Sequence, residues 1–263
     1  MKLFDIGLNL MHPAFNMDRE QVVQAAEAAG VSPLIITGTD ARSSFEAVKY
    51  ASRYPGKLYS TAGVHPHAVK DGTPRTLDEL RRIAGHAGVL AIGECGLDYN
   101  RDFSPRDMQR EWFEKQIHLA GELTMPLFLH ERDAFADFSG VLKRNRKSIT
   151  PMVVHCFTGT ERELEQYLDL GCYIGITGWI CDERRGAHLL DLLKQIPADK
   201  LLIETDAPFL MPRNMAGKPR NGRNEPKYLT HIAQVIAHHL DKDPTTLAQE
   251  TYTNTCRFFG IPA

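Results

Sequence analysis

Eight short apolar runs, each followed by a stretch with helical spacing, constrain the fold of this chain more than any other feature. Runs of apolar and β-branched residues are typical of buried strands, and apolar residues three and four apart are typical of amphipathic helices. The expected strands are residues 2–9, 33–38, 57–64, 89–94, 126–130, 152–157, 173–178 and 201–206, and the expected helices include residues 19–29, 43–54, 77–87, 107–123, 161–170 and 188–195.

This alternation predicts an α/β protein folded as a (β/α)8 TIM barrel. Parallel strands need crossover connections, and eight strand and helix units with no second compositional block favour closure of the sheet. The length fits one barrel domain over residues 1–263. An open doubly wound sheet is the alternative, but no G-x-G-x-x-G sequence follows the first expected strand. We therefore expect a functional site at the carboxyl ends of the strands.

Composition limits the classes of partner and the compartment. The 31 lysines and arginines against 33 acids give a net charge of −2, so no global basic field attracts nucleic acid or a membrane. An anionic substrate would have to be held locally. No apolar run approaches the roughly 18 residues of a membrane span, and the first residues do not form a signal sequence, so we expect a cytoplasmic protein. The odd number of cysteines, five, suits reduced thiols.

Histidine, glutamate and aspartate stand at the carboxyl ends of five of the expected strands. One such residue alone is more often a loop histidine or a helix cap. Five polar strand ends on one rim need partners, and a metal ion supplies them. The residues concerned are His65 and His67 after the third strand, Glu94 on the fourth, His130 on the fifth, His155 on the sixth, and Glu204 and Asp206 on the eighth.

The set Glu94, His130, His155 and Asp206 offers two imidazoles and two carboxylates. Such a set suits a hydrolytic divalent ion with an open position for water, and it leaves magnesium, manganese and zinc open. Glu204 and Asp206 are two residues apart and so share one face of a strand.

The same alternation gives the two cysteines beside these ligands a different role. Cys95 and Cys156 each follow a predicted ligand in the sequence, so their side chains should point the other way, toward the covering helices. A buried cysteine is usually a small core residue. We therefore expect both thiols in the core.

A cationic loop follows the eighth expected strand. Residues 207–224 contain no acid, whereas Arg213, Lys218, Arg220 and Arg223 all occur there. Barrels often bind phosphate near their last two loops, so this loop is a candidate for substrate phosphates. The alternative is a solvated loop whose charges only keep it in water.

Four motifs carry a resemblance to a known family. G-V-H-P-H at 63–67, G-E-C-G-L-D at 93–98, H-C-F-T-G at 155–159 and L-I-E-T-D-A-P at 202–208 resemble the TatD family of metal-dependent deoxyribonucleases, in that family's order. The resemblance implies an amidohydrolase-like barrel and a 3'-5' exonuclease that hydrolyses phosphodiester bonds of single-stranded DNA, with RNA as a second substrate and magnesium as the usual ion. We also expect a monomer and a role in DNA repair.

The family's metal-binding residues fall on Glu94, His130, His155 and Asp206. With a divalent ion lowering the pKa of its water, Asp206 is the candidate to orient or deprotonate that water. His65 is the candidate to contact the phosphate or protonate the departing 3' oxygen, and Glu204 is a further catalytic acid. The expected substrate-binding residues are His67, Arg213, Arg220 and Arg223.

One departure from the family pattern concerns the first strand. Most relatives carry His-x-His at its end, and here these positions hold Gly7 and Asn9. Two imidazole ligands are therefore missing, which implies one firm metal site and a second, weaker ion completed by substrate.

Two other functions remain open at this point. A small-molecule amidohydrolase, such as a lactonase or cyclic amidase, would use the same metal and water chemistry, although the cationic loop favours a phosphate substrate. A non-catalytic barrel that acts as a protein-binding scaffold is the second alternative, and the complete set of predicted ligands argues against it.

Overall fold

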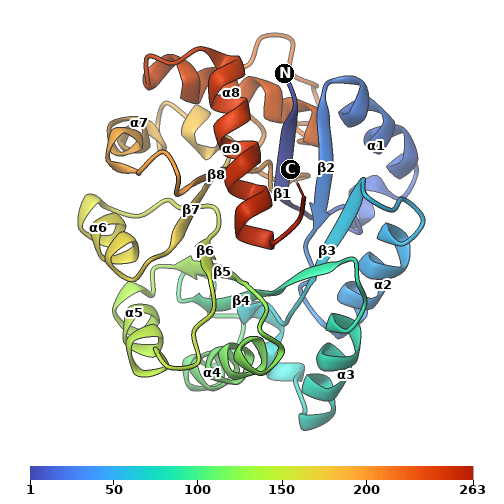
Figure 1. Ribbon diagram of the computed structural model, residues 1–263, viewed down its shortest axis with the longest axis vertical. Coiled ribbons are helices and arrows are strands. Elements are labelled where there is room, and N and C mark those ends of the chain that lie inside the picture. Colours follow the sequence, from blue (N-terminus) through green and yellow to red (C-terminus); the bar gives the residue numbers. More distant parts are fainter. Residues whose placement is uncertain (263) are drawn as a thin grey trace.

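The computed structural model describes residues 1–262, so Ala263, the last residue of the expected domain, lies outside it. Eight parallel strands form one sheet in sequence order, and helices surround it as an outer ring, which confirms the predicted (β/α)8 barrel (Figure 1). The strands are β1 (Leu3–Leu8), β2 (Val31–Ile36), β3 (Leu58–Ala62), β4 (Val89–Asp98), β5 (Leu127–Arg132), β6 (Met152–Val154), β7 (Tyr173–Ile176) and β8 (Leu201–Ile203).

The helices follow the strands as the sequence periodicity predicts. Local caps fix several of their starts: Asp40 accepts a hydrogen bond from the backbone N–H of Ser43, and Thr160 accepts one from that of Glu163. The helices are α1 (Arg19–Ala28), α2 (Ala41–Ala51), α3 (Pro74–Ala84), α4 (Arg106–Leu123), α5 (Phe135–Arg144), α6 (Glu161–Asp169), α7 (Ala187–Leu192), α8 (Leu229–His239) and α9 (Pro244–Phe259), with 3-10 helices η1 (Pro13–Phe15), η2 (Pro66–Asp71), η3 (Gly178–Cys181), η4 (Leu193–Gln195) and η5 (Pro226–Tyr228).

The seam between β1 and β8 is closed just beyond the end of β8. The backbone N–H of Asp206 donates to the carbonyl of Gly7 at 2.9 Å, and that of Asn9 donates to the carbonyl of Ala207 at 2.7 Å. Asp5, which is fully buried, accepts from both the backbone N–H and the hydroxyl of Thr205. The first and last strands are thereby held together next to the expected site.

Two apolar clusters form the core. The larger fills the space between strands and outer helices, and the smaller lies inside the barrel, where Phe4, Phe128 and Leu202 meet Phe258 and Phe259 of α9. In Figure 1, α9 lies across one mouth of the barrel. Tyr173, the first residue of β7, packs its ring against Phe258 at 4.9 Å, so the mouth that α9 covers is the one at the amino ends of the strands.

Strand ends differ from the sequence expectation in ways that matter for the site. β4 continues beyond Glu94 to Asp98, whereas β6 and β8 stop before His155 and Glu204. Among the described helices, none has the length and apolar character that crossing a bilayer requires. All five cysteines are free, as predicted.

Candidate active site

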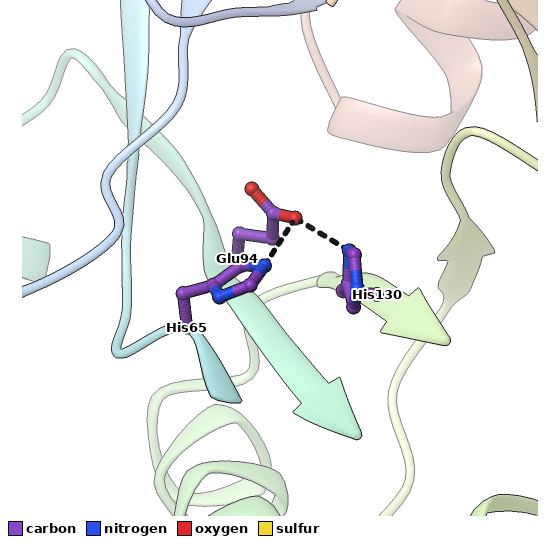
Figure 2. A group of neighbouring side chains, drawn as sticks. All are labelled: His65, Glu94 and His130. Carbon is purple, nitrogen blue, oxygen red and sulfur yellow. Dashed lines mark ion pairs between the residues drawn. The ribbon is translucent and has the colours of Figure 1, made fainter. Parts of the chain in front are cut away.

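Glu94 lies at the centre of a cluster of histidines at the carboxyl mouth of the barrel. Its Oε1 atom is 3.2 Å from Nε2 of His65, 2.9 Å from Nδ1 of His130 and 2.9 Å from Nε2 of His155. Figure 2 shows the rings of His65 and His130 both directed at the same oxygen of Glu94. Residues that lie far apart in the sequence therefore converge on one carboxylate oxygen.

The alternation of β4 explains how Glu94 reaches this position. Cys95 and Leu97 belong to the core cluster between strands and helices, so Glu94, Gly96 and Asp98 face the barrel interior. Gly96 has φ of 144°, and a Cβ atom there would collide with the carbonyl oxygen of His130. A glycine is required for β4 and β5 to approach this closely.

In two of these histidines, the ring nitrogen that does not face Glu94 faces another carboxylate. Nε2 of His130 lies 3.3 Å from Oδ2 of Asp98, and Nδ1 of His155 lies 3.4 Å from Oε2 of Glu204. Metal-binding histidines commonly have their outer N–H held by a carboxylate in this way, which fixes the tautomer and the ring orientation. Within residues 1–262, Nδ1 of His155 and Oε2 of Glu204 have no hydrogen-bond partner of good geometry.

Burial and charge oppose each other in this cluster. Burial would raise the pKa of Glu94, but His155 and His65 outweigh it and lower that pKa well below its usual value. Burial would likewise lower the pKa of His155, but Glu94 and Glu204 raise it well above its usual value. Burial also works against a charged His130, whose pKa is raised by hydrogen bonds to Asp98 and Glu94. The cluster thus pairs a stable carboxylate with two basic imidazoles.

His65 differs from the other two histidines in its tautomer. Its Nδ1 atom accepts the backbone N–H of His67 at 3.1 Å, which leaves the proton on Nε2, facing Glu94. Burial lowers the pKa of His65 to about 4, so the ring is neutral at pH 7. A neutral ring with Nε2–H is suited to donate to an oxygen atom.

The loop that carries His65 and His67 is held from below by α4. The side chain of Gln116 is buried, accepts the N–H of Val64 at 2.7 Å and donates to its carbonyl at 3.0 Å. His67 itself is half-buried, with Nε2 at 2.7 Å from Oδ2 of Asp98. These contacts fix both rings on a rigid support.

Asp98 is a site residue that the sequence reasoning missed. It contacts both His67 and His130 through Oδ2, and its Oδ1 accepts the backbone N–H groups of Asn100 and Arg101. Burial opposes its charge, but hydrogen bonds from His130 and His67 lower its pKa far below the usual range. The signal was present, because Glu94 and Asp98 lie four residues apart in one motif and so share a strand face.

Asp206 lies on the opposite side of the mouth from β4, after β8. Its Oδ1 accepts a hydrogen bond of 2.9 Å from Nδ2 of Asn9. Burial raises the pKa of Asp206 to about 8. Asn9, one of the two positions that depart from the His-x-His pattern, therefore orients a predicted catalytic carboxylate.

At Gly7, the other position that departs from the His-x-His pattern, the Glu204 side chain occupies the space that a side chain would need. A Cβ atom at Gly7 would lie 2.5 Å from Oε2 of Glu204 and 2.8 Å from the ring of Phe128. Oε1 of Glu204 accepts the backbone N–H of Cys156 at 2.6 Å. The Glu204 carboxylate is thus fixed where a side chain at position 7 would have to enter.

A cavity of about 450 Å³ contains most of the predicted residues. Its wall also includes Asn9, the position where relatives carry a ligand, and Thr39 and Phe209, which the sequence did not single out. The prediction that Cys156 is a core residue is wrong, because this cysteine lines the cavity; its φ of 47° breaks the strand alternation. Cys95 is fully buried, as predicted. The predicted site residues found on the wall are His65, His67, Glu94, His130, His155 and Asp206.

The cationic loop divides into two parts. Arg213 and Arg220 line a second cavity, which also contains Lys218. Arg223 faces elsewhere: it forms ion pairs with Asp18 at 2.7 Å and Glu225 at 2.9 Å. Its charge is already neutralised, which speaks against the substrate-binding role expected from the sequence.

The residues able to hold a metal ion can be tested by geometry. Potential ligand atoms of His65, Glu94 and His130 all lie within 4.8 Å of one another, which is compact enough for one ion. Glu94 and His130 belong to the predicted ligand set, and His65 was expected in catalysis instead. His155 contacts the same Glu94 oxygen, and Asp206 lines the same cavity.

Comparisons with known proteins agree with this arrangement. The model of the family of TatD-related DNases matches residues 4–260. A relative from Rahnella sp. strain Y9602, named 3'-5' ssDNA/RNA exonuclease TatD, is 50% identical over 261 residues, covering 99% of each chain.

Two solved structures are similar in fold along nearly the whole chain. The TatD homologue YjjV from Escherichia coli K12 has a TM-score of 0.89 at 29% identity and covers 99% of this chain and 98% of that one. An uncharacterized amidohydrolase from Saccharomyces cerevisiae has a TM-score of 0.86 at 27% identity, covering 98% and 100%. By sequence and by fold, the chain belongs to the family of TatD-related DNases.

Proposed function

We propose that this protein is a metal-dependent exonuclease that removes nucleotides from the 3' end of single-stranded DNA and RNA. The observation that carries the proposal is the convergence of three imidazoles on Oε1 of Glu94 inside an open cavity. The relative from Rahnella, at 50% identity, is named for this activity. Family, donor set and cavity therefore support the same chemistry.

The residues of the cluster fit a divalent cation. Glu94, His130 and His155 would hold it, and Asp206 offers a further carboxylate in the same cavity. Asp98 and Glu204 would hold the outer N–H groups of the two histidines and so keep the other ring nitrogen free for the ion. When bound, the ion supplies activation of a water molecule and neutralises charge on the phosphate. The mixed imidazole and carboxylate donors admit magnesium, manganese or zinc, and magnesium is the ion that the family resemblance implies.

Two side chains would act on the substrate and the attacking water, and a third would position one of the ligands. Asp206, oriented by Asn9, is placed to position that water and accept its proton. His65 carries its proton on Nε2 and is placed to donate to a phosphate or departing oxygen. Glu204 acts through His155 and is a positioning residue in this scheme.

Phosphate substrates are favoured over the neutral substrates of a lactonase or cyclic amidase. Arg213, Lys218 and Arg220 line the second cavity. This cavity is next to the first, because Leu210 lines the second and its sequence neighbour Phe209 lines the first. Such cations attract a polyanion and would leave a neutral small molecule unassisted. His67, half-exposed beside Asp98, is a further candidate for contact with the strand.

The proposal is tested with single-stranded DNA that carries a label at either end. With magnesium, a 3' label should be released at once as a mononucleotide, while a 5' label should give a ladder of shortening products. A chelator should stop both, and added magnesium or manganese should restore them. Internal cleavage, digestion from the 5' end, or full activity in chelator would contradict the proposal. A monomeric state, a cytoplasmic location and a role in DNA repair stay predictions.

A further inference from the structure

We propose that the second cavity, which we call the arginine pocket, binds the phosphate backbone of the substrate strand on the 5' side of the nucleotide being removed. The arginine pocket has a volume of about 570 Å³, and its lining includes Trp179, Asp182, Arg185, Arg213, Lys218 and Arg220. This inference rests on the proposed exonuclease function and adds a binding site to it.

Two loops at the carboxyl mouth build the arginine pocket. One contains η3 and follows β7, and the other, residues 207–224, follows β8. A Cβ atom at Gly178 would collide with the carbonyl oxygen of Leu210. The two loops therefore approach each other so closely here that only glycine fits. Leu210 lines the arginine pocket and its neighbour Phe209 lines the active-site cavity, so the two cavities adjoin.

Asp182 arranges the cations of the arginine pocket. Its side chain is only 4% exposed, and it contacts Arg185 at 3.0 Å and Arg213 at 3.8 Å. Arg185 also stacks on the ring of Trp179, with its guanidinium 4.4 Å from the ring centre. These contacts hold guanidinium groups in place before a ligand arrives, which lowers the entropy lost on binding.

The charge of the arginine pocket exceeds what Asp182 can neutralise. Four cations, Arg185, Arg213, Lys218 and Arg220, line it against that single acid. Within residues 1–262, Arg220 forms no ion pair, whereas Arg223 in the same loop forms ion pairs with Asp18 and Glu225. Exposed guanidinium groups with donors to spare match phosphate oxygens, which accept paired hydrogen bonds.

The direction of digestion determines which part of the nucleic-acid substrate lies in each cavity. In a 3'-5' exonuclease the terminal nucleotide and the bond that is broken lie in the metal cavity, and the rest of the strand leaves on its 5' side. The arginine pocket adjoins that cavity, so it receives the next phosphates of a longer strand and remains empty with a dinucleotide. The enzyme should therefore favour long strands through KM.

The test compares a long oligothymidylate with a dithymidylate in the presence of magnesium. For the double variant Arg213→Gln with Arg220→Gln, the ratio of kcat/KM between the long and the short substrate should fall at least about tenfold. Arg146→Gln is the matched control, because Arg146 is exposed in the loop between α5 and β6, at the opposite end of the barrel. An unchanged ratio in the double variant would overturn the assignment.

A second test uses chemically modified substrate DNA. Replacing the linkages on the 5' side of the terminal phosphodiester by neutral methylphosphonates should remove the advantage of length for the wild-type protein. The same modification should have little further effect on the double variant, because the cations that sense the charge are gone. Equal losses in both proteins would show that the phosphates are recognised elsewhere.

Binding without turnover separates this inference from the proposed function. In chelator, anisotropy of a labelled oligothymidylate should report weaker binding by the double variant, with a salt slope smaller by roughly 0.7 for each phosphate that the variant no longer neutralises. If the wild-type protein binds but digests neither substrate, the exonuclease proposal fails and the binding result still decides the arginine pocket. Identical affinity and salt slope in wild type and double variant would reject it.

Discussion

The two mouths of the barrel are made by the same eight strands and differ completely in chemistry. At the amino ends, Phe258 and Phe259 of α9 meet the inner aromatic rings, and the opening is filled with apolar side chains. At the carboxyl ends, Glu94 and its histidines remain around an open cavity. Burying apolar surface stabilises the fold, whereas clustered charges oppose it unless a ligand compensates. One mouth therefore provides stability and the other provides reactivity.

The sharpest way to break this division is to change Glu94 to Gln. The substitution keeps the shape of the side chain but removes the charge that three histidines face, so metal binding should fail. We expect nuclease activity to fall by about a thousandfold or more, with an unchanged circular dichroism spectrum. Elemental analysis after loading with manganese should show that the variant retains no metal. Near wild-type activity in a folded variant would refute the assignment of Glu94.

Phe258→Ala tests the other mouth of the barrel, at the amino ends of the strands. Phe258 is buried and packs on Tyr173 and Phe259, so its removal should leave a cavity and lower the free energy of unfolding by about 3–5 kcal/mol. Denaturant unfolding measures this loss. At a temperature where the variant is folded, kcat should match that of the wild type, and a large fall in kcat would mean that the two mouths are coupled.

A smaller effect on stability is expected at Asp5, which binds Thr205 at the seam between β1 and β8. Burial raises the pKa of Asp5 from 3.8 to about 7, so the folded protein holds this proton more tightly than the unfolded chain. The stabilisation from this group is complete below pH 4 and is lost as the pH rises to 7, by at most about 4 kcal/mol. Asp5→Asn should remove that pH dependence, because an amide does not titrate.

The difference in unfolding free energy between wild type and Asp5→Asn isolates this group, since all other titrations cancel. It should shift in favour of the variant between pH 4 and pH 7 and be flat above that range. Calorimetric melting at several pH values measures it. A difference that does not depend on pH would mean that Asp5 remains charged in the folded protein.

The barrel and the main metal-site candidates were predictable because strand alternation is a short-range rule. Glu94, His130 and His155 all follow apolar runs whose ends must meet on one rim of a barrel. Asp98 was missed because β4 continues past the expected end of the strand. Cys156 was misplaced because a left-handed backbone conformation at that residue interrupts the alternation, and nothing in its residue type announces this.

The charged loop shows a second limit of sequence reasoning. Arg213 and Arg223 are both cations of one acid-free segment, yet only Arg213 lines the arginine pocket. Asp18, the partner that neutralises Arg223, is 205 positions away in the sequence, so no local pattern could reveal the pair. Long-range packing decides which charges of a loop are free.

The contact between Gly7 and Glu204 also sets a rule for remodelling this metal site. An imidazole on the first strand and a carboxylate at position 204 would compete for the same volume, because Glu204 and Phe128 already fill the space above Gly7. Adding a nitrogen donor at position 7 would require a smaller residue at position 204, which would in turn release the outer nitrogen of His155. At this corner of the barrel, a nitrogen donor on the first strand can be gained only by giving up the carboxylate that faces His155.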